Sequence, residues 1–105
     1  MSDETLLFDV LTPLGFRVHC YEGYWLEKVV ARHPDMAERL EAVISTLSEP
    51  EEVRVSSHDE GVLLFYRTDI KRWVCAVARQ DGEQGFLITA YPADKLKSGK
   101  TIWPK

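Results

Sequence analysis

Residues that could carry chemistry gather near the end of this 105-residue chain. The stretch "GFLITAYPADKLKSGKTIW", residues 85–103, places the hydroxyls of Thr89 and Tyr91 and three lysines, Lys95, Lys97 and Lys100, within twelve positions. Lysine offers a compact positive charge for phosphate, and a threonine or tyrosine hydroxyl can orient phosphate oxygens or donate a proton. The alternative is a solvated tail whose lysines only keep the protein soluble.

Cleavage of RNA without a metal ion requires three kinds of group. A base removes the proton of the 2′-hydroxyl, cations stabilise the phosphorane, and an acid protonates the leaving 5′-oxygen. His33 could be the base or the acid, because histidine titrates near neutral pH, and Arg67 offers a bidentate fork for phosphate. We expect only local roles for His19, within an apolar strand, and for His58, in an acidic turn.

Other chemistries lack their sequence patterns. There is no Cys/His cluster with metal-ligand spacing, no glycine-rich phosphate loop and no nucleophile elbow. We therefore predict no metal and no cofactor.

The first half of the chain predicts a hairpin and two helices. Two apolar runs around a Pro-Leu-Gly turn predict a β-hairpin over residues 5–11 and 16–21. Apolar residues at helical spacing in "GYWLEKVVARH" predict an amphipathic helix of about three turns. A second helix is expected from Pro34 to about Ser48. Its apolar stripe is Met36, Leu40, Val43, Ile44 and Leu47.

After Pro50 the hydrophobic period changes to that of strands. "EEVRVSS", "VLLFYRT", "WVCAVARQ" and "FLITAY" are separated by short turns, which predicts an antiparallel meander. The predicted fold class is α+β, in which the N-terminal hairpin and two helices pack on a four-stranded antiparallel sheet meander, as one domain over residues 1–105. If both later hairpins pair residues of equal parity, Arg67, Thr89 and Tyr91 share an open face.

The charge is distributed unevenly along the chain. Residues 1–60 hold thirteen acids and five Lys or Arg, which gives −8, whereas residues 61–105 hold four acids and eight Lys or Arg, which gives +4. If the second half forms one surface, that surface suits an anion; the alternative is that the two halves neutralise each other. An acidic N-terminus, two cysteines and the lack of an apolar run of roughly 18 residues predict a reduced, cytoplasmic protein with no membrane partner.

Several segments together resemble a known superfamily. "RHPDM", "LSEPEEVRVS", "VLLFYR", "WVCAVAR" and the 85–103 stretch are similar, in order and spacing, to small phage- and toxin-associated domains of the barnase–EndoU–colicin–RelE-like nuclease superfamily. The resemblance covers about residues 20–103. It implies a metal-independent ribonuclease fold whose antiparallel sheet carries the catalytic side chains.

The resemblance also implies roles for individual residues. His33 would be the general base or acid, Arg67 the phosphate clamp and Thr89 a phosphate-orienting hydroxyl. Tyr91 would stack on a base or donate a proton. The expected RNA-binding residues are Lys95, Lys97, Arg79 and Lys100. Each has a structural alternative: His33 could fill a helix corner, Arg67 could pair with Asp69 or Asp94, and Thr89 and Tyr91 could be ordinary strand residues.

These observations lead to three hypotheses about function. The first is a small ribonuclease of toxin or phage type, which would normally need a neutralising antitoxin-type protein. The second is an inactive member of the fold that binds RNA or a protein, an interpretation favoured by the net charge of −4. The third is an interaction domain that dimerises through an exposed strand edge.

Overall fold

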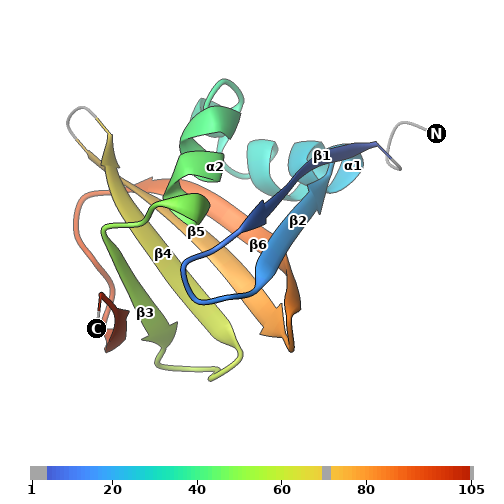
Figure 1. The fold of residues 1–105 in the computed structure, drawn as a ribbon. Coiled ribbons are helices and arrows are strands. Elements are labelled where there is room, and N and C mark those ends of the chain that lie inside the picture. Colours follow the sequence, from blue (N-terminus) through green and yellow to red (C-terminus); the bar gives the residue numbers. More distant parts are fainter. Residues whose placement is uncertain (1–4, 70–71, 105) are drawn as a thin grey trace.

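The computed structural model describes residues 5–69 and 72–104, which form one seven-stranded sheet with helical segments packed on one face (Figure 1). The strands are β1 (Leu6–Leu11), β2 (Arg17–Tyr21), β3 (Glu52–Ser56), β4 (Val62–Asp69), β5 (Arg72–Asp81), β6 (Gln84–Ala93) and β7 (Gly99–Trp103). Their order is β1-β2-β6-β5-β4-β3-β7, and every pair is antiparallel except the parallel pair β2–β6. The predicted four-stranded sheet with two packed helices is therefore wrong: the fold is a mixed α/β fold with seven strands in one sheet.

The error lies in two pairings between distant segments. The hairpin β1–β2 and the meander β3–β4–β5–β6 are present as predicted. However, β2 also joins β6 through the pair His19 and Phe86, and the expected tail forms β7 beside β3, with Gly99 opposite Ser56. Pairing between strands far apart in the chain leaves no local periodicity, so a pattern search along the sequence does not detect it.

The helical segments are shorter than expected. α1 (Glu22–Tyr24) continues into the π-helical turn η2 (Trp25–Val30), and the 3₁₀ turn η3 (Pro34–Met36) precedes α2 (Leu40–Ser48). The second helix thus begins at Leu40 rather than Pro34, because Pro34 starts only one 3₁₀ turn, in which the Ala37 N–H donates to the Pro34 carbonyl. The predicted apolar stripe still faces the core: Met36, Val43 and Leu47 are buried.

The pairing of β4 with β5 corrects the assignment of the two sheet faces. Asp69 pairs with Arg72, so two residues separate the closing pair and every odd-numbered residue meets an even-numbered one, as Tyr66 meets Cys75. Equal parity was therefore the wrong expectation for this pair of strands. The helix-covered core holds the odd residues of β4 and the even residues of β5, namely Leu63, Phe65, Val74, Ala76 and Ala78.

The other face, which we call the open face, carries a smaller apolar cluster. Its buried members are Leu64, Tyr66, Cys75, Val77 and Ala93. Residues 94–98, the crossover segment, lead from β6 to β7, which lies beyond β5, β4 and β3 in the sheet (Figure 1). Leu96 of this segment packs against the cluster, so the crossover segment lies along part of the open face.

Candidate functional site

A groove of about 600 Å³ lies on the open face between the crossover segment and the end of β3. Val62, Leu64 and Val77 give it an apolar floor, and Lys95 and Lys97 give it a cationic side. The remaining lining residues are Ser56, Ser57, His58, Tyr91, Leu96 and Ser98, so no lining residue is acidic. In a chain with seventeen acids, this composition favours an anionic ligand.

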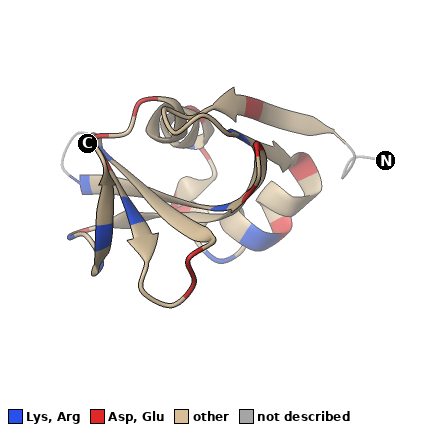
Figure 2. Ribbon diagram, turned by 60° about the horizontal axis from the view of Figure 1, so that its bottom comes forward, with Lys and Arg blue, Asp and Glu red and all other residues tan. Residues whose placement is uncertain are grey.

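The charges around the groove differ from those elsewhere on the molecule. Figure 2 shows Lys and Arg on strands beside the C-terminus, whereas Asp and Glu lie mainly on helices and connecting loops. A second hollow, of about 250 Å³ beside Met36 and Trp73, also contains arginines. These are already paired, Arg39 with Asp69 and Arg72 with Asp94. The groove on the open face is thus the better candidate for binding an anion.

His33 and Lys97 each lie beside the ring of Tyr91. The Lys97 Nζ lies 5.0 Å from the centroid of this ring. The His33 ring lies 5.6 Å from the Tyr91 ring, at an interplanar angle of 40°. Because Tyr91 lines the groove, the three side chains form one cluster at its side. This is the strongest agreement between the sequence-predicted site and the structure.

The edge of β6 explains how His33 reaches Tyr91. β2 pairs with β6 only as far as Phe86, so the rest of this edge is available to the helical segment η2. The Tyr24 hydroxyl donates a 2.7 Å hydrogen bond to the carbonyl of Ile88 on that edge. The His33 N–H donates to the Val29 carbonyl at 2.8 Å, which fixes His33 at the end of η2.

The hydroxyls of Tyr91 and Thr89 point into the protein. Both oxygens are buried, and neither has a hydrogen-bond partner of good geometry among the described residues. Burial raises the pKa of Tyr91 far above its ordinary value, and the neighbouring Cys75 thiol adds to this effect. Tyr91 therefore keeps its proton and presents its ring to the groove, an arrangement that favours its predicted stacking role over proton donation.

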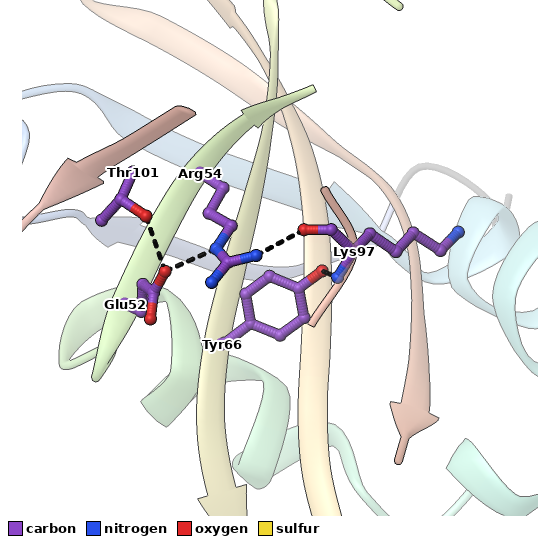
Figure 3. A network of polar contacts seen from close by, with 5 residues as sticks. All are labelled: Glu52, Arg54, Tyr66, Lys97 and Thr101. Carbon is purple, nitrogen blue, oxygen red and sulfur yellow. Dashed lines mark hydrogen bonds and ion pairs between the residues drawn. The ribbon is translucent and has the colours of Figure 1, made fainter. Parts of the chain in front are cut away.

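A polar network fixes the backbone of Lys97 (Figure 3). The Lys97 N–H donates to the Tyr66 hydroxyl at 3.0 Å, and Arg54 Nη1 donates to the Lys97 carbonyl at 2.7 Å. Arg54 Nε and the Thr101 hydroxyl both donate to Glu52 Oε2. The network anchors the backbone of the crossover segment. The Lys97 side chain extends away from the network, so the Lys97 ammonium group stays available to bind a ligand. No carboxylate of the described residues forms an ion pair with this ammonium.

The same contacts shift the ionisation of the residues beneath the crossover segment. Burial raises the pKa of Tyr66 to about 12, against a smaller opposite effect of the Lys97 N–H. The hydrogen bond from Arg54 lowers the pKa of Glu52, and the Thr101 hydroxyl adds to it. At neutral pH, Tyr66 is therefore a neutral acceptor and Glu52 a charged one, as the network requires.

Arg67 does not join the cluster. It pairs with Val74 and lies on the helix-covered face. Its Nη1 donates a 2.6 Å hydrogen bond to the carbonyl of Glu49, the residue after α2. The expectation that Arg67 shares a face with Thr89 and Tyr91 is wrong, because the β4–β5 pairing joins opposite parities.

The other predicted RNA-binding residues have separate positions. Arg79 is exposed on the open face and donates to Asp59 at 2.9 Å. Lys100 lies on β7 opposite Val55 and is not among the residues that line the groove. The structure thus brings His33, Lys95 and Lys97 to the region around Tyr91, and it separates Arg67 and Lys100 from them. Thr89 shares the face of Tyr91 but does not line the groove.

Sequence reasoning missed His58 and Tyr66. His58 follows β3 and lines the groove, and its backbone N–H donates to the Ser56 hydroxyl at 3.2 Å. Its acidic neighbours, Asp59 and Glu60, concealed this role in the sequence. Equal parity would have placed Tyr66 on the helix-covered face, whereas the pairing of Asp69 with Arg72 places it on the open face.

The described residues add two further findings. No three His, Cys, Asp or Glu side chains among them come together as a metal site. None of their helices has the length and apolar character needed to cross a membrane.

Comparisons of the chain with protein-family models, curated proteins and solved structures find no match. The functional argument therefore rests on the groove and on the residues around it.

Proposed function

We propose that this protein is a small metal-independent ribonuclease that binds RNA in the groove of the open face. The observation that carries the proposal is the cluster of His33 and Lys97 at the Tyr91 ring, on a groove without acidic lining residues. RNA presents phosphate anions, and Lys95 and Lys97 supply the charges that bind them. The resemblance of the sequence to the barnase–EndoU–colicin–RelE-like superfamily supports the same function.

The proposed chemistry uses His33 and Lys97, which both lie beside the Tyr91 ring. His33 removes the proton of the 2′-hydroxyl, and the 2′-oxygen attacks the neighbouring phosphorus. The ammonium of Lys97 stabilises the negative charge of the phosphorane. A water molecule then protonates the 5′-oxygen as the bond from phosphorus to this oxygen breaks, and the proton held by His33 returns to solvent. The products are a 2′,3′-cyclic phosphate and a free 5′-hydroxyl.

One observation favours a second candidate function, in which the protein binds RNA without cutting it. The hydroxyls of Thr89 and Tyr91 are buried, so neither can contact a phosphate without a change of conformation. The net charge of −4 points the same way. A neutralising antitoxin-type partner belongs only to the ribonuclease hypothesis and stays a prediction.

Conditional expression in bacteria tests the proposal. The wild type and Leu26→Ala, whose side chain is 52 % exposed on η2, are expected to arrest growth and degrade cellular RNA. His33→Ala and Lys97→Gln, at matched protein levels, are expected to do neither. Normal growth and intact RNA with the wild type would contradict cleavage. Capture of RNA by the wild type in that case would support the binding function.

A further inference from the structure

The open face continues beyond the groove onto β6 and β2. Strand pairing places four residues in one row across β4, β5, β6 and β2: Val62, Arg79, Phe86 and His19. Val62 lines the groove, so the row starts there and leads away from it. Phe86 is two strands from Val62, a separation of about 10 Å at the usual strand spacing.

Aromatic rings are exposed along this row. Phe86 and Tyr21 are each 40 % exposed, although both are large and largely apolar. The His19 ring packs edge-on against Tyr21, with centroids 5.7 Å apart. Exposed aromatic rings on a sheet face are a common platform for the unstacked bases of single-stranded RNA, because every base offers a π-face for stacking.

The arginines beside these rings are already paired. Arg79 donates to Asp59 and Arg17 donates to Asp9, each at 2.9 Å. Among the described residues, the surface around Phe86 therefore offers no unpaired arginine for a phosphate, in contrast to the lysines of the groove. A phosphate is better placed in the groove, and an uncharged base is better placed on Phe86.

We infer that the aromatic row, which consists of Arg79, Phe86 and His19, binds one base of single-stranded RNA. The phosphate next to this base lies in the groove. This inference rests on the proposed function, since it requires RNA in the groove. The Phe86 ring stacks on the base. Arg79 can exchange Asp59 for a phosphate at little cost, because an exposed ion pair contributes little stability. A duplex is excluded from the row, because its bases are already stacked on one another.

Binding of an uncleavable oligonucleotide tests the inference separately from catalysis. The probe is a fluorescent single-stranded RNA with 2′-O-methyl groups throughout, which leaves no 2′-hydroxyl to attack the phosphate. Fluorescence anisotropy compares the wild type, Phe86→Ala, Phe86→Tyr and Leu26→Ala. We expect Phe86→Ala to bind roughly 5- to 100-fold more weakly, and the other two variants to bind as the wild type does.

The salt dependence of binding adds a second readout. Phe86→Ala is expected to keep the wild-type slope of log affinity against log salt, because it removes no phosphate contact. Lys97→Gln is expected to reduce this slope by about 1. A Phe86→Ala variant with a reduced slope would overturn the stacking assignment.

The remaining outcomes separate the inference from the proposed function. Wild-type affinity in Phe86→Ala, with continued cleavage of unmodified RNA, would overturn the aromatic row and leave the ribonuclease standing. No binding of the probe and no cleavage of unmodified RNA would overturn both. A wild-type dimer that Phe86→Ala dissociates would also overturn the inference, because the face would then be an interface between two copies of the chain.

Discussion

Lys97 shows how one backbone position can make a side chain available. Its N–H and carbonyl are both bound, to Tyr66 and Arg54, so the peptide has little freedom. Its ammonium has no carboxylate partner among the described residues and lies over the Tyr91 ring. Tyr66 thus acts on the groove only through Lys97. It is a positioning residue, and its effect on stability can be measured without RNA.

Tyr66→Phe is expected to lower the free energy of unfolding by about 1–3 kcal/mol, because the Lys97 N–H loses its acceptor. Urea unfolding at neutral pH measures this change. Tyr21→Phe is the matched control, since Tyr21 is exposed and its hydroxyl makes no hydrogen bond with the described residues. Equal stability of Tyr66→Phe and the wild type would show that the Lys97 N–H has another acceptor in solution.

Alkaline pH tests the same hydroxyl differently. Burial raises the pKa of Tyr66 to about 12, whereas an unfolded tyrosine titrates near about 10. The folded state holds this proton more tightly, so the stabilisation is complete below about pH 10 and is lost as the pH rises through about 12. We expect unfolding free energies to fall over this range, and to fall less in Tyr66→Phe. The same decline in both proteins would contradict the assignment.

At the scale of the elements, the spacing of β4 and β5 along the chain determines which side chains share a face of the sheet. Two residues separate Asp69 from Arg72, so Tyr66 and Cys75 share the open face and Arg67 goes to the other side. Periodicity predicted each strand of the meander, because local hydrophobic alternation survives any choice of partner. It could not predict the faces: one residue more or less in a loop, or one bulge, exchanges them.

A bulge in β6 had the opposite effect on the predicted register. The β5–β6 pairing shifts between Val77 and Ala78, so Val77 meets Thr89 whereas Ala78 meets Leu87. Thr89 and Tyr91 therefore share the open face with Val77 and Cys75, while Leu87 enters the core. Equal parity, the condition on which Thr89 and Tyr91 were expected on the open face, thus holds for this part of the β5–β6 pair, because the bulge offsets the opposite parity set at the Asp81–Gln84 pair.

Arg67 stabilises the C-terminal end of α2. Its guanidinium donates to the Glu49 carbonyl, where the dipole of α2 is negative, so the contact stabilises the helix terminus. We expect Arg67→Met to lower the free energy of unfolding by about 1–2 kcal/mol. RNA cleavage, measured well below the unfolding transition, should keep the wild-type rate. A loss of cleavage with unchanged stability would return Arg67 to the phosphate-binding role that the sequence suggested.

At the scale of the whole molecule, two long-range pairings turn a meander into a seven-stranded sheet. β2 extends the sheet beside β6 and adds the aromatic residues of the open face, and β7 extends it beside β3. The crossover segment exists because β7 lies four strands away from β6 in the sheet. The groove therefore depends on contacts that no local pattern encodes, which is why its lysines resembled a solvated tail in the sequence.

Gly85 tests the close packing of β6 against β5 and the Phe16 ring. A Cβ at this position would lie 2.5 Å from the Arg79 carbonyl oxygen and 2.9 Å from the Phe16 ring. We expect Gly85→Ala to lower the free energy of unfolding by about 1–3 kcal/mol through overpacking. Gly61→Ala is the matched control, because its Cβ would make only ordinary contacts, the nearest at 3.4 Å. Urea unfolding of both variants decides: a Gly85→Ala protein as stable as Gly61→Ala would contradict this packing.

The most direct test of the central claim is cleavage of a labelled RNA by the purified protein in the presence of EDTA. We predict cleavage by the wild type, products that end in a 2′,3′-cyclic phosphate, and none from an RNA with 2′-O-methyl groups. His33→Ala, shown to be folded by its urea unfolding curve, should leave the RNA intact. Uncut RNA with the folded wild-type protein, or equal cleavage by His33→Ala, would contradict the assignment of the groove as a ribonuclease site.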